Sequence, residues 1–378
     1  MANFESDVGY AWWMMERFWI QVAETCARQG TRCYVAYPRI NTVPDAVAAS
    51  PLEPLALDMF DRTAAGRARI VAALEEHAIG AVYFTDQAFR DPFYGSLRRH
   101  GVDAVVNHDH TPGDRPPSRG LRGLLSALSN RLPGITCDLW VAISPLIRQR
   151  ALTASRIPAV RCVVVQNGID RDTPGPAVRE EARRRLGLDA DDIAVISVGR
   201  AIRYKGLDFS LALAARAVDD GLDRVVFIHA GDGPDFEEFE SEAKRLGLLP
   251  DRYRLPGRME NVPMLLEGCD LALHPSRGEG FSLAVLEYMR AGLPVLVPDR
   301  PTVCQAIRSG ETGIVYRAED VGSALEGLRS LAESGERRRI MGAAARAEML
   351  ERYTWERTAS DFQPVADFLA GVGERPRP

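Results

Sequence analysis

The sequence predicts an α/β protein of two domains, each built around a parallel β-sheet. Short apolar runs alternate with longer amphipathic runs along the whole chain, a pattern typical of parallel strands connected by helices. The chain has 378 residues, more than one ordinary hydrophobic core accommodates. An Asn-Gly turn and two prolines follow an apolar run within residues 163–176, which indicates a domain boundary. We therefore expect one domain over residues 1–165 and a second over residues 166–354.

The composition is that of a soluble globular protein, with 46% hydrophobic and 26% charged residues. A formal net charge of -5 argues against nucleic acid as the main partner, because phosphate backbones are bound by broad basic surfaces. The six cysteines form no Cys-x-x-Cys pair, and no histidine cluster accompanies them, which favours a reduced, cytoplasmic setting and predicts no metal site. No apolar run approaches the roughly 18 residues of a membrane-spanning helix. The acidic, aromatic start of the chain does not resemble a secretory signal.

Ten apolar runs are predicted to be buried strands. Between them lie amphipathic helices such as residues 16–30 and 234–247, where Gly30 and Gly247 suit the helix C-termini. The start of the chain is irregular, because a doubly wound domain opens with an apolar strand. Either residues 2–4 form a shortened strand, or the strand begins upstream of the residues given. The predicted strands are residues 81–84, 104–107, 139–144, 162–165, 193–199, 225–231, 253–257, 271–275, 294–297 and 313–316.

Two glutamates stand eight positions apart in the otherwise apolar segment 278–295. A Gly-rich loop follows the preceding strand, Ser282 suits a helix N-cap, and Gly292 with a nearby proline suits the end of that helix. Glu279 therefore falls in the loop and Glu287 falls inside the helix.

Glu287 is expected to be largely desolvated, because most of its helical neighbours three and four positions away are apolar. A buried carboxylate without hydrogen-bond donors is costly. A vicinal diol such as a ribose supplies two O–H donors, and the N-terminus of the helix is suited to an anion. The alternative is a salt bridge from Glu287 to a nearby arginine, with Glu279 solvated in its loop.

A cationic turn follows the strand that ends at Gly199. Arg200, Arg203 and Lys205 come directly after it, followed by Gly206 and a helix. Ligands of such sheets bind at the carboxyl ends of the strands. The planar fork of arginine and the compact charge of lysine suit a diphosphate. A solvated basic turn is the alternative.

Two further patterns are better explained structurally. The Gly-x-Gly of residues 231–233 lacks a third glycine, and acidic residues crowd the helix start behind it, where they stabilise the helix dipole and would repel a phosphate. We interpret it as a tight turn. The Asp-x-Asp at residues 189–191 precedes its strand and is interpreted as a solvated turn rather than a metal site.

Two patterns in the first half of the chain each have two possible explanations. His108 and His110 flank an aspartate directly after a strand. They are either a pair in a surface loop, or one of them is a hydrogen-bonding histidine that faces the cleft between the domains. Residues 115–132 carry four arginines around an apolar core with helical character. Such a segment docks weakly on anionic lipid or is a simple surface excursion.

Together these stretches resemble the retaining GT-B glycosyltransferases of family 4, the glycosyl transferases group 1. The resemblance covers about half of the chain, nearly all of the second domain, whereas the first domain matches weakly, through residues 138–144. It implies two Rossmann-like domains whose parallel sheets face each other across a cleft that holds a nucleotide sugar. It also implies that the C-terminal helix, residues 355–378, crosses back to the first domain.

The resemblance assigns a role to each matching residue of the second domain. Arg200 and Lys205 would hold the diphosphate, Glu287 the ribose hydroxyls, and Glu279 would lie beside the donor sugar. Further contacts with the donor are implied for Gly9, Gly199, Arg258, Gly280, Phe281, Ser282 and Leu283.

In the first domain, the resemblance makes His110 the histidine that positions the donor sugar, with His108 as the fallback. Two positions depart from the family. Its Gly-Gly loop after the first strand is replaced by residues 6–13, with Gly9 alone, and its Pro-Glu pair in the second domain is replaced by Val-Cys-Gln, with Gln305 in the place of the acid.

The resemblance implies retaining transfer of a sugar from a nucleoside diphosphate sugar, with a UDP-sugar favoured, to a hydroxyl acceptor and without an essential metal. A surface polysaccharide or a lipid-linked intermediate is the hypothesis for the acceptor, at the inner face of a membrane. Two alternatives remain: a nucleotide-sugar epimerase or hydrolase of the same fold, and a non-catalytic nucleotide-sugar-binding partner of another enzyme.

Overall fold

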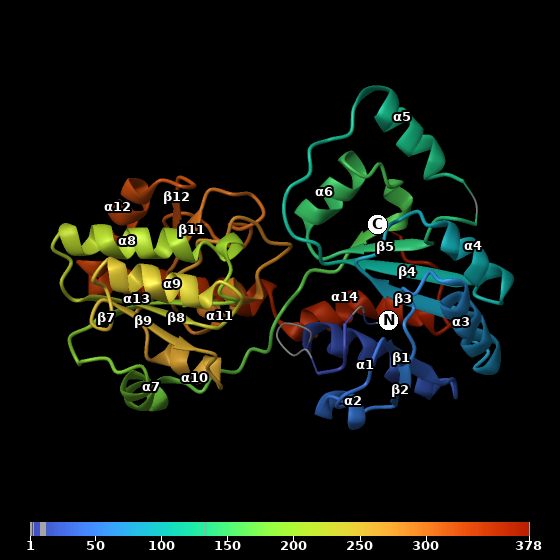
Figure 1. Ribbon diagram of the computed structural model, residues 1–378, viewed down its shortest axis with the longest axis horizontal. Helices are drawn as coiled ribbons and strands as arrows, with labels where there is room; N and C mark the ends of the chain where they lie inside the picture. The colour runs from blue at the N-terminus through green and yellow to red at the C-terminus, as the bar shows by residue number, and fades with distance from the viewer. Residues whose placement is uncertain (1, 3, 8–12, 133, 378) are drawn as a thin grey trace. The chain divides into compact units, whose positions relative to one another are not determined.

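The computed structural model describes residues 2, 4–7, 13–132 and 134–377. The chain divides into two compact units, one formed by Met1–Gln166 with Glu356–Pro378 and the other by Asn167–Trp355. We describe each unit separately (Figure 1). All six cysteines are free thiols.

The N-terminal unit holds two parallel sheets. A four-stranded sheet has the order β3-β4-β5-β6, and a separate pair joins β1 to β2. The four predicted strands of this unit are confirmed, although β5 and β6 end one or two residues early, whereas β1 and β2 were not predicted. The strands are β1 (Cys33–Tyr37), β2 (Leu52–Ala56), β3 (Ala81–Thr85), β4 (Ala104–Asp109), β5 (Leu139–Ala142) and β6 (Cys162–Val164).

The C-terminal helix belongs to the N-terminal unit. In its core, the ring centroids of Phe362 and Phe18 lie 4.7 Å apart. Gln21 Nε2 also donates to the carbonyl of Ala359 at 2.8 Å. The helices of this unit are α1 (Trp13–Arg28), α2 (Asp45–Ala48), α3 (Ala64–Glu76), α4 (Pro92–Arg99), α5 (Gly120–Ser129), α6 (Pro145–Thr153) and α14 (Trp355–Leu369).

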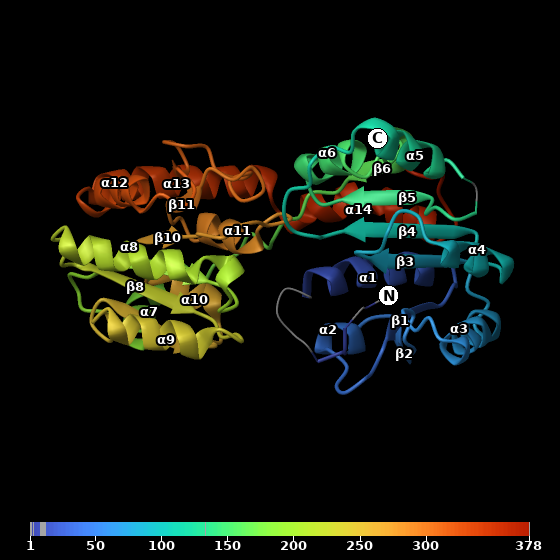
Figure 2. The ribbon, with the colours of Figure 1, turned by 45° about the horizontal axis from the view of Figure 1, so that its top comes forward.

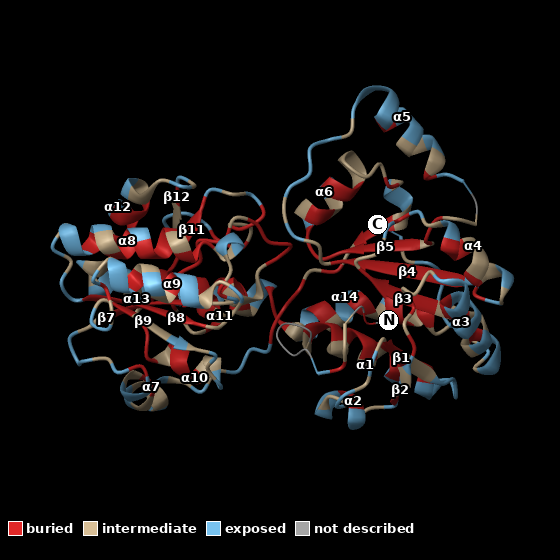
Figure 3. Ribbon diagram, in the orientation of Figure 1, coloured by how far each residue is buried: buried red, intermediate tan, exposed pale blue. Residues whose placement is uncertain are grey.

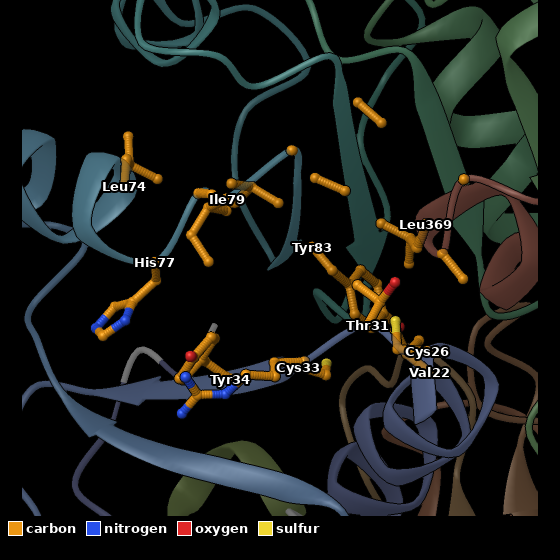
Figure 4. Close-up of a pocket in the computed structure, with 18 of the residues that line it drawn as sticks. Val22, Cys26, Thr31, Cys33, Tyr34, Leu74, His77, Ile79, Tyr83 and Leu369 are labelled. Atoms are coloured by element: carbon orange, nitrogen blue, oxygen red, sulfur yellow. The ribbon is translucent and has the colours of Figure 1, made fainter. Parts of the chain in front are cut away.

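A cavity of about 790 Å³ lies between the β1–β2 pair and the edge of β3 (Figure 4). Cys33, Tyr34 and Tyr83 line it from the two strands, and Leu74 and His77 line it from the end of α3. The described residues before α1 form no strand. The backbone N–H of Ala2 donates to the carbonyl of Ala36 at 3.0 Å, at the far end of β1. Among the described residues, the β1–β2 pair is thus separate from the four-stranded sheet.

The C-terminal unit is a six-stranded parallel sheet in the order β12-β11-β10-β7-β8-β9. All six predicted strands are confirmed, although β10 stops two residues early. The strands are β7 (Ile193–Val198), β8 (Val225–Ala230), β9 (Tyr253–Gly257), β10 (Leu271–Leu273), β11 (Val295–Pro298) and β12 (Gly313–Tyr316).

Helices cover both faces of this sheet (Figure 2). The core between the strands and α8, α9 and α12 is apolar, with Phe209 stacked on Tyr316 at 5.3 Å. Across the described residues, no helix is long and apolar enough to traverse a bilayer. The helices are α7 (Arg179–Arg185), α8 (Leu207–Asp219), α9 (Phe236–Arg245), α10 (Val262–Glu267), α11 (Leu283–Arg290), α12 (Val321–Ala332) and α13 (Gly335–Arg352).

Candidate functional site

The strand order of the C-terminal unit reverses between β7 and β10. The chain moves outward from β7 through β8 to β9, then crosses back to place β10 on the other side of β7. In open α/β sheets, ligands bind beyond the carboxyl ends of the strands at such a reversal. The two loops that leave β7 and β10 carry the cationic turn and the acidic pair predicted from the sequence.

These two loops are in direct contact. The backbone N–H of Arg277 donates to the carbonyl of Tyr204 at 2.9 Å. Gly206 has a φ of +76°, and a Cβ on it would lie 2.1 Å from the carbonyl oxygen of Pro275. Only glycine fits a left-handed position this close to another backbone. The glycine that starts α8 therefore brings the two loops together.

Lys205 and Glu279 form the link between the loops at side-chain level. Lys205 Nζ lies 2.7 Å from Glu279 Oε1. His274 Nε2 lies 3.0 Å from the same oxygen and 3.1 Å from Ser282 Oγ. Ser282 also caps α11, because its Oγ accepts from the N–H of Val285, as predicted.

Glu279 is held as a carboxylate. It is 8% exposed, and burial alone would raise its pKa. The ammonium of Lys205 and the hydrogen bond to His274 outweigh burial and lower the pKa of Glu279 to about 2. Lys205 uses one of its three N–H donors in this bond. Two donors of its ammonium therefore remain for an anionic ligand.

Glu287 is the partly buried acid of α11. Burial raises its pKa above the usual value, and nearby Arg290 opposes that rise. Arg290 itself donates to the carbonyl of Asp170 at 3.0 Å. The salt bridge that we kept as an alternative is absent, since no ion pair or hydrogen bond of Glu287 is found among the described residues.

The turn before α11 is held by a side chain from the loop after β11. Gln305 Nε2 donates to the carbonyls of Gly280 and Thr302, both at 2.9 Å. Gln305 thus shapes the turn. Gly280 and Phe281 are buried, and Leu283 is the half-buried first residue of α11.

Three further basic residues follow β7 and β9 at the surface. Arg200, directly after Gly199, is exposed, and so is Arg258 after β9. Arg203 is also exposed and is paired with Glu238.

The Gly-x-Gly after β8 packs on the backbone that follows β7. A Cβ on Gly233 would lie 2.6 Å from the carbonyl oxygen of Ala201. This close approach supports our interpretation of a tight structural turn rather than a dinucleotide motif.

The N-terminal unit has a second polar cluster, at the ends of β3 and β4. His108 is fully buried, with Tyr83 Oη 2.5 Å from its Nδ1, and its ring packs against Phe18 and Phe362. His110 is half-buried, and among the described residues its Nε2 has no hydrogen-bond partner. The fallback histidine is thus a core residue, whereas His110 is only half-buried; the Nε2 atoms of both rings are buried and have no partner among the described residues. Gly9, the remaining predicted residue, lies outside the described residues.

Burial suppresses charge in this second cluster. It lowers the pKa of His110 to about 4, with Asp109 opposing the effect. It raises the pKa of Asp86 to about 7, although Asp86 Oδ1 accepts from the N–H of His110 at 2.6 Å. Arg150 pairs with Asp109 and donates to the carbonyl of Gly113, which fixes the loop after β4.

Sequence reasoning missed two members of these clusters. His274 directly follows a buried strand and precedes a Gly-rich loop, the same position that identified the cationic turn. Asp86 also directly follows a strand, but a single acid in a polar loop gives no distinct signal. Within the described ranges, no group of three or more His, Cys, Asp or Glu side chains is arranged to hold a metal ion.

Solved structures with the same fold are glycosyltransferases. HepE from Anabaena, in complex with UDP and glucose, aligns with a TM-score of 0.73 over 97% of this chain and 98% of that chain, at 18% identity. WaaG, a glycosyltransferase involved in lipopolysaccharide biosynthesis, aligns with a TM-score of 0.68 over 97% and 98%, at 19% identity. The fold is therefore that of the GT-B glycosyltransferases.

The sequence comparisons match the C-terminal unit to a family. Residues 178–348 match the family model of the glycosyl transferases group 1. The D-inositol 3-phosphate glycosyltransferase of Rhodococcus erythropolis is 31% identical over 69% of this chain and 59% of its own length. The protein of the same name from Geodermatophilus obscurus is 30% identical over 58% of this chain and 50% of its own length. This chain carries a glycosyl transferases group 1 domain and spans between half and three-fifths of these curated relatives.

Proposed function

We propose that this protein transfers a sugar from a nucleoside diphosphate sugar, with a UDP-sugar favoured, to a hydroxyl acceptor. The main support is the Lys205–Glu279 contact of 2.7 Å at the reversal of the strand order, together with the partly buried Glu287 in α11, the helix that follows the loop of Glu279. A fixed cation and an acid without a described partner at one sheet edge suit a diphosphate and a ribose. UDP and UDP-glucose bound to HepE, which shares the fold, favour this donor class.

Lys205 and Arg200 would act on the leaving group. Sugar transfer passes through an oxocarbenium-like state and releases a nucleoside diphosphate. Cations placed before the reaction stabilise the charge that develops on that diphosphate. Glu279 would hold Lys205 in position through their contact of 2.7 Å. We expect that this cationic pair lets the reaction proceed without an essential metal.

Glu287 would recognise the ribose. Because a partly buried carboxylate without hydrogen-bond donors is costly, Glu287 would be stabilised by donors from a ligand. The 2′- and 3′-hydroxyls of a ribose provide two. The amides of Gly280, Phe281, Ser282 and Leu283 at the start of α11 would bind the donor through backbone contacts.

His110 would position the donor sugar as a neutral imidazole, because burial lowers its pKa to about 4. We propose transfer with retention at the anomeric carbon, by attack from the face that the diphosphate leaves. The bond between the anomeric carbon and the phosphate oxygen breaks, and a bond to the acceptor oxygen forms. The departing phosphate takes the acceptor's proton.

The acceptor that we propose is a surface polysaccharide or a lipid-linked glycan precursor. WaaG, which shares the fold, is involved in lipopolysaccharide biosynthesis. The N-terminal unit, which the family model does not match, would recognise the acceptor.

A thermal-shift screen against UDP-, GDP- and TDP-sugars tests the donor class. A tight ligand stabilises the folded state by mass action, so we expect a UDP-sugar to raise the melting temperature. No shift with any nucleotide sugar would contradict the proposal. Turnover is then measured with and without acceptors, in the presence of EDTA. Release of free sugar or of an epimer without acceptor would instead favour the hydrolase or epimerase, and donor binding without any turnover would favour a non-catalytic partner.

A further inference from the structure

Helix α5 presents an apolar stripe to solvent. It is a short helix of 10 residues, and only Gly123 within it is buried. Figure 3 colours most of this helix as exposed or intermediate. The stripe recurs at helical spacing, so that its side chains share one face. It consists of Leu121, Leu124, Leu125 and Leu128, which are 71%, 56%, 57% and 54% exposed, and Leu132, just beyond the end of the helix, is 49% exposed.

The opposite face of α5 is polar and attached to the protein. Asn130 Nδ2 donates to the carbonyls of Ser155 and Arg156 at 2.7 and 3.0 Å. Ser126 Oγ donates to the carbonyl of Ser155 at 3.3 Å. A surface helix of a globular protein normally turns its apolar face inward. In α5 the orientation is reversed, and hydrogen bonds fix that reversal.

Four arginines surround the stripe: Arg115, Arg119, Arg122 and Arg131 are all exposed. No acidic residue occurs between Asp114 and Asp138. The segment is therefore uniformly cationic in a protein whose formal net charge is -5. Exposed leucines next to cations form the pattern of a helix that lies in the interface of an anionic bilayer.

We propose that α5 with its flanking arginines docks the N-terminal unit onto an anionic phospholipid surface. The leucine stripe enters the boundary between headgroups and acyl chains, and the arginines contact the phosphates. A single short stripe with few cations gives weak, reversible binding that falls as salt rises. The inference does not depend on sugar transfer, because it rests on the surface of the N-terminal unit alone.

Vesicle flotation tests the proposal with the full chain. Vesicles of phosphatidylcholine mixed with phosphatidylglycerol in equal amounts are compared with vesicles of phosphatidylcholine alone. We expect the protein to float with the anionic vesicles at low salt, to remain in solution with the neutral ones, and to lose binding at high salt. Equal binding to both vesicle types, or none to either, would overturn the proposal.

Two groups of variants separate the apolar and the charged parts of the surface. The triple change Leu124→Ser, Leu125→Ser and Leu128→Ser removes the centre of the stripe and is expected to weaken flotation by about tenfold or more. Its control is the pair Val160→Ser and Ile340→Ser, which are exposed apolar residues outside α5.

The charge variant keeps every leucine. Arg119→Gln, Arg122→Gln and Arg131→Gln together are expected to remove the preference for anionic vesicles, whereas Arg67→Gln, exposed on α3, is not. Circular dichroism checks that each variant is folded. Size-exclusion chromatography without vesicles checks the competing explanation. If the wild type is a dimer and the leucine variant a monomer, the stripe is an interface between two copies and the lipid proposal fails.

Discussion

The two units place ionisable groups at equivalent positions, yet they treat charge in opposite ways. In the C-terminal unit, the loops after β7 and β10 hold the Lys205–Glu279 pair, where the pKa of Glu279 falls to about 2. In the N-terminal unit, the residues that directly follow β3 and β4 shift toward neutral forms, because burial raises the pKa of Asp86 to about 7 and lowers that of His110 to about 4.

The opposite pKa shifts of Glu279 and Asp86 depend on whether the buried carboxyl group has a cation beside it. Glu279 loses water but gains an ammonium, whereas Asp86 is compensated mainly by a backbone N–H. Fixed charges suit a diphosphate, and neutral donors and acceptors suit sugar hydroxyls. We therefore propose that the diphosphate is bound by the C-terminal cluster and that His110 acts on the sugar.

The largest expected effect is loss of the donor site. Lys205→Ala and Glu287→Ala should each abolish the thermal shift caused by the nucleotide sugar and lower kcat/KM by about a hundredfold or more. Lys244→Ala and Glu237→Ala, both on the surface of α9, are the matched controls and should bind normally. Near-normal donor stabilisation in both site variants would refute the assignment.

The contact between the two loops is tested by Gly206→Ala. A Cβ there would meet the carbonyl of Pro275 at 2.1 Å and force apart the loops that carry Lys205 and Glu279. We expect a loss of about 3 kcal/mol in unfolding free energy, together with weaker donor binding. Gly221→Ala has a similar φ of +75° with nothing within 4 Å of its Cβ. It should cost only about 1 kcal/mol and leave binding intact. Equal losses in urea denaturation would mean that strain at φ, rather than the contact, is responsible.

Glu279→Gln tests how much the charge of the Glu279 carboxylate, paired with Lys205, contributes to stability. The pKa of Glu279 in the folded protein lies below its usual 4.5, so the ionised carboxylate adds stability above pH 4.5 and this contribution is lost as the pH falls toward about 2. We expect the variant to be about 2 kcal/mol less stable at neutral pH. The difference from wild type should shrink over that acidic window. A difference independent of pH would show that the charge is not what stabilises the pair.

The smallest effect on the fold is expected for His110, which distinguishes it from His108. His108→Ala removes a side chain packed among Phe18, Tyr83 and Phe362 and should cost about 3 kcal/mol. His110→Ala should change the melting temperature little and lower kcat by about tenfold, through poorer positioning of the sugar. Reversed outcomes, with His110→Ala unstable but active, would make His110 a structural residue.

The same contrast explains what the sequence could predict. Each predicted strand of the C-terminal unit is confirmed, because buried parallel strands read as continuous apolar runs. In the N-terminal unit, β1 and β2 were missed. They form an isolated pair of five residues each, and β2 carries Pro54, which is compatible only with an edge strand. The contact between Lys205 and Glu279 spans 74 positions. No local sequence pattern predicts a contact over that separation. It could be expected only because the carboxyl ends of parallel strands lie at one edge of the sheet.

A crystal structure of the protein with UDP tests the central claim most directly. We predict that the diphosphate lies within hydrogen-bonding distance of Lys205, at the edge between β7 and β10, and that the ribose hydroxyls donate to Glu287. UDP bound elsewhere, or bound with its ribose away from α11, would contradict the account.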